Sequence, residues 1–527
     1  MMRARVRFTD ARGIAVAIAT VVALTAGVRP ARAQAAEVSG VLNLQRALEI
    51  AEAKSETVAL ARVALTRNDG DFVRAKSGRR PQLSATASYD RSLANEFQGV
   101  FDDIDFGGGG GGSDSGGFDN LPFGRANTWR ATLSFSQNVY DWGRLDAQDA
   151  LVSAGRRSAD QALTAARAQV LFDVTQAYYD AALSGRLVEI AEGAFDQADA
   201  TLRQVQAGFD AGTQPEFEVL RARVNRDSQV PQVIRQRVNR DVALLRLKQQ
   251  LDLPADAEVS LAESLDDERL APPAPFAEQV AAVESSLSPG GAVLVAIQTN
   301  LALPDRNTVA EAATVVSLRE ASLKAVLAER RPTANLTSNY SRIAFPSGPW
   351  PAFDKSNWSI AASVSVPLLT GGRQRGNEMV AKADVEQAQV QLRQVQELAA
   401  LDTRATWAEL VAARAAWEAT AGTVQQASRA YEIADVRYQA GLSTQLELSD
   451  SRLLLRQAEA NRALAARDLQ VARARVALLP NLPLGAAVTG LVGQRTQVPS
   501  APVATSQGSG QIQSATAPIR ASQTGAR

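Results

Sequence analysis

The sequence predicts a mainly α protein with a transmembrane β-barrel, to which an internally duplicated chain supplies four strands and long coiled-coil helices. The first observation is a glycine break between alanine-rich helical segments, which occurs at Gly212 and again at Gly441, 229 positions later. Three further landmarks keep this spacing: Trp129 with Trp358, Gly143-Arg144 with Gly372-Arg373, and Leu253-Pro254 with Leu482-Pro483. One spacing shared by four landmarks indicates a tandem duplication. The second observation is a set of short apolar–polar alternations behind an export signal.

The composition argues against most enzyme classes. The 527 residues include 56 basic and 56 acidic side chains, and this zero net charge gives no reason to expect nucleic acid as a partner. The sequence has no cysteine and no histidine, which excludes disulfides, thiolate nucleophiles, imidazole bases and most zinc or haem sites. Carboxylate catalysis and calcium binding stay open, but no carboxylate pair stands apart from the solvated helix faces. We therefore expect no enzyme, no cofactor and no metal site.

The N-terminal residues 1–33 have the pattern of a secretory signal peptide. Four arginines precede an apolar run over 14–28, and Ala31-Arg32-Ala33 forms a small-residue cleavage site before Gln34. A membrane anchor is the alternative, although the apolar run is short for a bilayer. No later stretch reaches 18 apolar residues, so an exported chain of this kind would have to enter a membrane as strands.

Each repeat is expected to contain, in order, a helix, a strand, a loop, a strand, a long helix, a glycine tip and a returning helix. In the first repeat the helical patterns cover 41–78, 143–207 and 216–251. At about 1.5 Å per residue the long helix would span about 100 Å and the returning helix about 55 Å, so the helix over 41–78 would supply the missing length. The expected boundaries are 1–33 for the signal peptide, 34–254 for the first repeat, 255–308 for a connector, 309–483 for the second repeat and 484–527 for a largely disordered tail.

The four predicted strands alternate apolar residues with serine and threonine, and each has the length of a tilted transmembrane strand. One large aromatic residue stands at the loop end of every strand: Tyr89, Trp129, Tyr340 and Trp358. Amphipathic rings at one level are typical of an aromatic girdle at a membrane interface. A sheet of a soluble protein with one solvent-exposed face is the alternative. The export signal and the four aromatic residues favour the membrane.

The loop between the first two strands contains six consecutive glycines at 107–112, with several aspartates nearby. A flexible exposed loop is the simplest interpretation of this composition, and calcium binding is the alternative. The sequence does not decide what the loop does.

In this order, and duplicated, the elements resemble the TolC family of outer-membrane efflux proteins over about 42–483. The sharpest local matches are the strand-to-helix step over 364–373 and the tip over 437–441. Four strands cannot close a barrel and an open sheet edge cannot face lipid, so several chains must pool their strands. The resemblance implies a homotrimer, with a twelve-stranded barrel in outer-membrane lipid and a twelve-helix periplasmic tunnel. It also implies passive conduction of drugs, other small molecules or polypeptides, driven by an inner-membrane transporter through a periplasmic adaptor.

The resemblance further assigns roles to residues at the two glycine tips. The tips would form the periplasmic entrance and dock the adaptor through Phe209, Gly212, Arg437, Tyr438, Gly441 and Leu442. The first tip departs from the family pattern, because Gly208 stands where the second tip has Arg437.

The resemblance also implies that acidic residues just after the second tip line the constriction as a periplasmic gate. Glu447 and Asp450 lie three residues apart and so share a helix face, and Glu218 is the first-copy equivalent of Glu447. Two simpler roles compete with the gate: Thr444 and Glu447 fit a capping box, and acids in a first turn complement the helix dipole.

The rival function is a soluble periplasmic coiled-coil scaffold or adaptor. The exported substrate and the particular transporter and adaptor cannot be read from the sequence.

Overall fold

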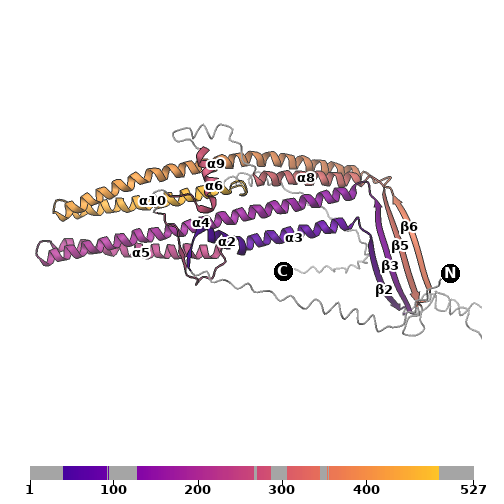
Figure 1. The fold of residues 1–527 in the computed structure, drawn as a ribbon, viewed down its shortest axis with the longest axis horizontal. Helices are drawn as coiled ribbons and strands as arrows, with labels where there is room; N and C mark the ends of the chain where they lie inside the picture. The colour runs from indigo at the N-terminus through magenta and orange to yellow at the C-terminus, as the bar shows by residue number, and fades with distance from the viewer. Residues whose placement is uncertain are drawn as a thin grey trace, which may run out of the picture. The chain divides into compact units, whose positions relative to one another are not determined.

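The computed structural model describes residues 40–91, 93, 127–265, 270–286, 306–344, 353 and 355–485 (Figure 1). The predicted signal peptide, the glycine-rich loop and nearly all of the predicted tail lie outside these residues. Contacts divide the chain into two units. The tip unit comprises 1–59, 170–286 and 410–477, and the sheet unit comprises 60–169, 287–409 and 478–527. Each unit is described by itself.

The sheet unit contains all four predicted strands. They are β2 (Gln82–Arg91), β3 (Asn127–Tyr140), β5 (Thr333–Ala344) and β6 (Lys355–Ser365), in the antiparallel order β2-β3-β5-β6 (Figure 1). The helical part consists of α3 (Glu56–Ser77) from residue 60, α8 (Asn307–Ala328), and the first parts of α4 (Arg144–Asp210) and α9 (Arg373–Gln439).

The register divides the sheet into an apolar and a polar face. Tyr89 pairs with Trp129, Leu133 pairs with Tyr340, and Tyr340 pairs with Trp358, so side chains two positions apart on each strand continue one face. That face carries mainly leucine, alanine, valine and aromatic residues. The opposite face carries mainly serine, threonine and asparagine. Large side chains on the apolar face are uncovered in the single chain; Trp358 and Val364 are each 70% exposed.

Both repeats turn from the second strand into the long helix through two residues with positive φ. The second copy uses Gly371 (φ 57°) and Gly372 (φ 87°), whereas the first uses Trp142 (φ 53°) and Gly143 (φ 89°). A left-handed conformation is strained for tryptophan and unstrained for glycine. Local contacts hold the strained residue: the Trp142 ring stacks edge-on against Tyr140, with centroids 4.7 Å apart.

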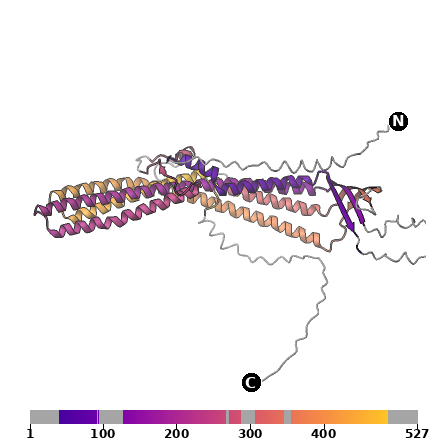
Figure 2. The same cartoon turned by 90° about the horizontal axis from the view of Figure 1, so that it is seen from below.

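The tip unit gathers the distal parts of α4 and α9 with the returning helices α5 (Glu216–Gln250) and α10 (Gln445–Leu478), which run alongside one another (Figures 1 and 2). The long helices and returning helices were predicted, and the structure confirms them. A short parallel pair, β1 (Gly40–Leu42) with β4 (Val259–Leu261), was not predicted. The buried Tyr178 of α4 donates its hydroxyl proton to the Leu42 carbonyl at 3.0 Å and so holds this pair against the bundle.

The prediction of one continuous helix over 41–78 was wrong. It begins with β1, and it then divides at Ser55 into α2 (Leu44–Lys54) and α3. Ser55 has extended backbone (φ −54°, ψ 125°), and its hydroxyl accepts a bond from the Val58 N–H at 3.5 Å, so it ends one helix and caps the next. The equivalent residue before α8 is Arg306, 251 positions later, and α3 and α8 each have 22 residues.

Arg306 anchors the start of α8 inside the sheet unit. Its guanidinium pairs with Asp402 of α9 at 3.0 Å, with side chains only 2% and 3% exposed. The same group donates to the Leu482 carbonyl at 3.2 Å. A buried ion pair of this kind fixes which helices pack together, because separating its partners would leave a charge unpaired.

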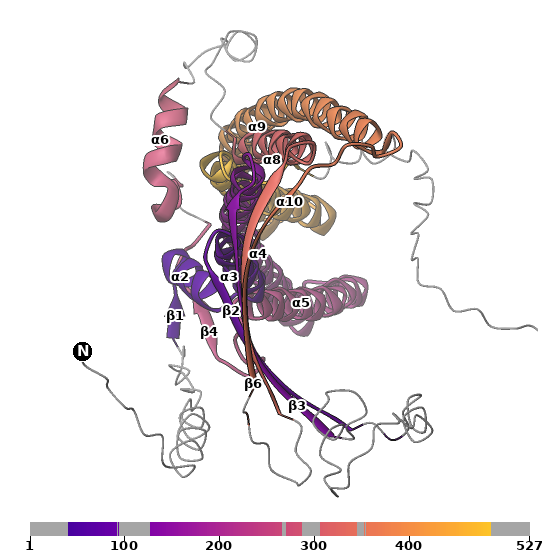
Figure 3. The same cartoon turned by 90° about the vertical axis from the view of Figure 1, so that its right-hand side faces the viewer.

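The predicted connector over 255–308 contains, in its described part, β4, the short 3₁₀ helix η2 (Ala274–Phe276) and α6 (Ala277–Ser286). Helix η2 lies against α2, and α6 continues from it (Figure 3). Arg473 of α10 holds this segment by donating to Glu284 at 2.9 Å and to the Leu270 carbonyl at 2.7 Å. No described helix combines the length and hydrophobicity needed to cross a membrane.

Candidate functional site

The two glycine tips have the same backbone. Gly212 (φ 73°) and Gly441 (φ 71°) are both left-handed, which favours glycine. In the first tip the Thr213 N–H donates to the Gly208 carbonyl at 2.8 Å; in the second the Leu442 N–H donates to the Arg437 carbonyl, also at 2.8 Å. These bonds join equivalent positions, so each break is the same helix-ending turn.

Apolar side chains are exposed at both tips. Phe209 is 40% exposed on the first tip and Leu442 is 72% exposed on the second, whereas Tyr438 is half-buried. Two further residues belong to this surface and were missed from the sequence. Phe217 and Leu446 occupy equivalent positions on the returning helices, and they are 67% and 63% exposed. The spacing of 229 could have found them, because it aligns one with the other.

Gly208 replaces an arginine in the first tip for a steric reason. A Cβ atom at this position would lie 2.7 Å from Cγ of Gln214. The residue equivalent to Gln214 in the second tip is the shorter Ser443, so the second tip has room for Arg437. The Arg437 guanidinium then pairs with Glu447 at 3.4 Å, with both side chains about half exposed.

Glu447 makes the local contacts expected of a helix cap. Its N–H donates to the Thr444 hydroxyl at 3.3 Å, which is one half of a capping box. Its ion pair with Arg437 is exposed, and exposed pairs of this type contribute only about 0–1 kcal/mol. Asp450 is exposed in the next turn. The gate interpretation concerns several copies of the chain, and it stays a prediction.

The charge of Glu218 in the first repeat acts on Tyr438 in the second. Burial raises the pKa of the Tyr438 phenol above its ordinary value, and the nearby Glu218 carboxylate raises that pKa further. The charges of Arg452 and Arg221 oppose this rise. One oxygen of Glu218 is buried without a hydrogen-bond partner among the described residues. The two tips are therefore electrostatically coupled, and the sequence alone did not predict this coupling.

The four residues of the predicted aromatic girdle lie on the apolar face of the sheet. The rings of Tyr89 and Trp129 are stacked with centroids 4.8 Å apart, and the Tyr89 hydroxyl donates to Asn127 at 2.9 Å. Tyr340 pairs with Trp358, whose indole N–H donates to the Ser338 hydroxyl at 3.0 Å. The two pairs are offset by four residues along β3. All four rings are therefore on one face, and their level in a membrane is a prediction.

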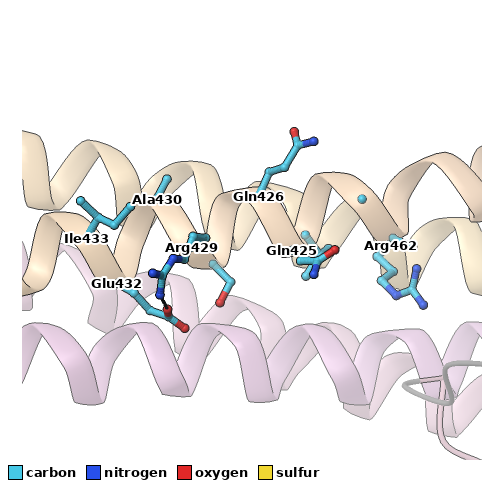
Figure 4. Close-up of a pocket in the computed structure, with 11 residues that line it drawn as sticks. Gln425, Gln426, Arg429, Ala430, Glu432, Ile433 and Arg462 are labelled. Carbon is cyan, nitrogen blue, oxygen red and sulfur yellow. Dashed lines mark hydrogen bonds and ion pairs between the residues drawn. The ribbon is translucent and has the colours of Figure 1, made fainter.

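An open hollow of about 1240 Å³ follows α9 over 421–433 beside Arg462 of α10 (Figure 4). Arg429 and Glu432 form an ion pair at 2.9 Å in its wall, and the Arg462 guanidinium lies 3.8 Å from the centroid of the Trp417 ring. The other lining residues are alanine, glycine, valine, glutamine, isoleucine and one serine, which has no imidazole or amine base beside it. The hollow therefore lacks the nucleophile–base arrangement of a hydrolase.

Solved outer-membrane channels share this fold over most of their length. The Campylobacter jejuni CmeC channel has a TM-score of 0.63 at 15% identity, with 86% of this chain and 89% of that chain covered. Vibrio cholerae VceC has a TM-score of 0.62 at 18% identity, with 83% and 96% covered. The open state of Neisseria gonorrhoeae MtrE has a TM-score of 0.62 at 18% identity, with 83% and 89% covered. Identities this low establish a common fold and say nothing about cargo.

The sequence comparison gives the family directly. Among curated proteins none is matched. The family described as outer membrane efflux protein matches residues 47–251 and 299–481, which are more than half of the chain and include both repeats. The resemblance predicted from the sequence is confirmed. The chain therefore belongs to the outer membrane efflux protein family, as a transport channel of the outer membrane and not an enzyme.

Proposed function

We propose that the chain forms the channel-tunnel of a tripartite efflux or type I secretion system, as a homotrimer that conducts substrates passively from the periplasm to the exterior. The observation that carries the proposal is the sheet: among the described strands, β2 and β6 each pair on one side only. One face is apolar and uncovered, and the other carries hydroxyl and amide side chains.

Such a sheet fits a membrane only as part of a closed barrel. In lipid every backbone N–H and C=O needs a partner, so the two open edges require strands from other copies. Three copies would supply twelve strands, enough for a barrel wider than its own side chains fill. The apolar face would then meet outer-membrane lipid, with the girdle at its interface, and the serine, threonine and asparagine face would line a wet lumen.

Helix α5 supports association of copies independently of the sheet. Exposed apolar residues stand on it at four of five positions spaced seven apart: Phe217, Val224, Val238 and Leu245, with Pro231 at the fifth. Exposed apolar residues at heptad spacing are typical of a helix that packs against another helix. A neighbouring copy is the partner that also closes the barrel.

The tips support a periplasmic entrance that docks an adaptor. Exposed apolar side chains such as Phe209 and Leu442 gather where the chain reverses, and patches of this kind mark sites of protein association. An inner-membrane transporter would supply the energy, and Glu447, Asp450 and Glu218 would form the gate. The related MtrE channel was solved in an open state, and this supports the proposal that an entrance built on this fold opens.

Fractionation and bilayer recording test the proposal together. We expect the full chain to be in the outer-membrane fraction, to require detergent for extraction, and to give stable conductance steps when reconstituted in planar bilayers. A soluble monomer that leaves bilayer conductance unchanged would overturn the proposal and favour the periplasmic scaffold.

A further inference from the structure

Helix α10 carries two half-buried arginines in the tip unit. Arg452 and Arg456 are four residues apart, so they share one face of the helix. Both line a small cavity together with Ser449 of α10 and with Asn225 and Gln229 of α5. Helix α4 completes the wall with a glutamine and two alanines. The cavity therefore lies between helices of the first and the second repeat.

The hydrogen bonds in the cavity wall leave two N–H donors without an acceptor among the described residues. Arg456 Nη1 donates to Gln229 Oε1 at 2.6 Å. The Gln229 amide nitrogen is directed elsewhere, toward the Asn225 carbonyl at 3.3 Å and the Ser228 hydroxyl at 3.2 Å, so the orientation of its carbonyl is fixed. The Nε–H groups of Arg452 and Arg456 are both buried and have no acceptor among the described residues. A buried donor without an acceptor is costly, and more so on a charged group.

The two arginines also differ in their charge balance from Arg467 and Arg473 of the same helix. Arg467 pairs with Asp180 and Asp468, and Arg473 pairs with Glu284. Neither Arg452 nor Arg456 forms an ion pair with a described carboxylate. Burial lowers the pKa of Arg456, and the neighbouring positive charge of Arg452 lowers that pKa further. The wall therefore carries two like charges and no described carboxylate, and the Arg452 guanidinium lies 5.6 Å from the centroid of the Tyr431 ring.

We propose that this cavity binds a single monatomic anion, of which chloride is the natural example. The cavity volume of about 20 Å³ fits one occupant of that size and is too small for phosphate or sulfate. Both guanidinium Nε–H groups, the Asn225 amide and the Ser449 hydroxyl are the available donors. A water molecule would accept the same bonds, but it would place no negative charge between the two guanidinium groups, whereas an anion would balance their repulsion.

The position of the site gives the anion a structural role. Ser449 and Arg456 follow Gln445, the first residue of α10, by 4 and 11 residues, which places the cavity about 6–16 Å along the helix from the second tip. An anion held by donors of α5 and α10 joins the first-repeat hairpin to the second near the tips. The inference does not depend on the proposed transport function.

Anomalous scattering tests the site directly. Crystals of the full chain soaked in sodium bromide should show a bromide peak within hydrogen-bonding distance of Nε of Arg452 and Arg456. Arg456→Gln should lose the peak, whereas Arg223→Gln, which removes an exposed arginine of α5, should keep it. Ordinary water density without anomalous signal in the wild type, or a peak that persists in Arg456→Gln, would overturn the proposal.

A solution measurement keeps the test independent of crystals. At equal ionic strength, sodium chloride should raise the melting temperature of the detergent-solubilised protein by about 1–3 °C over sodium gluconate. Arg456→Gln and Arg456→Lys, which both remove Nε–H, should lose this difference, and Arg223→Gln should keep it. Equal melting temperatures of the wild type in the two salts would contradict anion binding.

Discussion

The first and second tips make the same turn from different side chains. Both use a left-handed glycine and the same backbone hydrogen bonds. The side chains differ, because Gly208 and Gln214 of the first tip are replaced at the equivalent positions of the second by Arg437 and Ser443. The second tip consequently carries the Arg437–Glu447 ion pair, which the first cannot form. Duplication has preserved the backbone while the charges diverged. In a trimer the entrance would be nearly sixfold in shape and threefold in charge.

The largest predicted effect on stability comes from substituting the residues that precede α3 and α8. Arg306→Met should destabilise the protein by about 3–5 kcal/mol, because it removes the guanidinium that pairs with the buried Asp402 carboxylate. Ser55→Ala, the equivalent change in the first repeat, should cost only about 0.5–1 kcal/mol. Thermal unfolding followed by circular dichroism measures both. Adding Asp402→Leu to Arg306→Met should recover most of the loss; no recovery would contradict this account of the pair.

The charge difference between the tips should be visible in ion selectivity. Neutralising the second tip with Glu447→Gln and Asp450→Asn should lower the cation-to-anion permeability ratio in planar bilayers by roughly two- to tenfold. Glu218→Gln in the first tip serves as the matched comparison and should change the ratio less, because Arg221 stands where the second tip has Asp450. Unchanged conductance and selectivity in the double variant would leave Glu447 with its capping role alone.

The steric explanation for Gly208 predicts a coupling between two residues of the first tip. Gly208→Ala should gain helix propensity only when Gln214→Ser has removed the crowding, so a double-mutant cycle of melting stabilities should show about 1 kcal/mol of coupling. The equivalent cycle in the second tip, Arg437→Ala with Ser443→Ala, should show almost none. Coupling of equal size in both tips would argue against the steric explanation.

The smallest expected effect is an alkaline titration confined to the second tip. Because the pKa of Tyr438 is raised in the folded state, its contribution to stability is complete below the ordinary tyrosine pKa and is lost as pH rises through the raised value. Tyr438→Phe should reduce the fall in melting temperature above about pH 10. The equivalent residue of the first tip is Phe209, which has no proton to lose, so Phe209→Leu should leave that pH dependence unchanged. An alkaline profile that Tyr438→Phe does not alter would remove Tyr438 as its source.

The parts of the structure that follow from local pattern were predictable from the sequence. Gly212 and Gly441 end helices because glycine adopts the left-handed backbone conformation without strain. The apolar–polar alternation around Trp129 and Trp358 predicts strands without any knowledge of their neighbours. The break at Ser55 was not predictable, because the flanking residues continue the helical pattern and only the hydrogen bonds of the folded chain divide it.

Contacts between the repeats could not be predicted, because they depend on which helices become neighbours. The Glu218 charge acts on Tyr438 and Arg456 donates to Gln229, although more than two hundred residues of sequence separate each pair. From the sequence alone, each of these residues looks like an ordinary solvent-exposed residue of a helix. The same reasoning applies to Gly208, whose meaning depends on where the Gln214 side chain lies.

We propose that two unequal repeats in one chain build a channel only when three chains combine. Native mass spectrometry of the detergent-extracted protein counts the chains directly. A complex of three chains that withstands removal of detergent in the gas phase is the expected result. A single chain or a dimer as the stable species would contradict the claim, since neither could supply twelve strands to close the barrel.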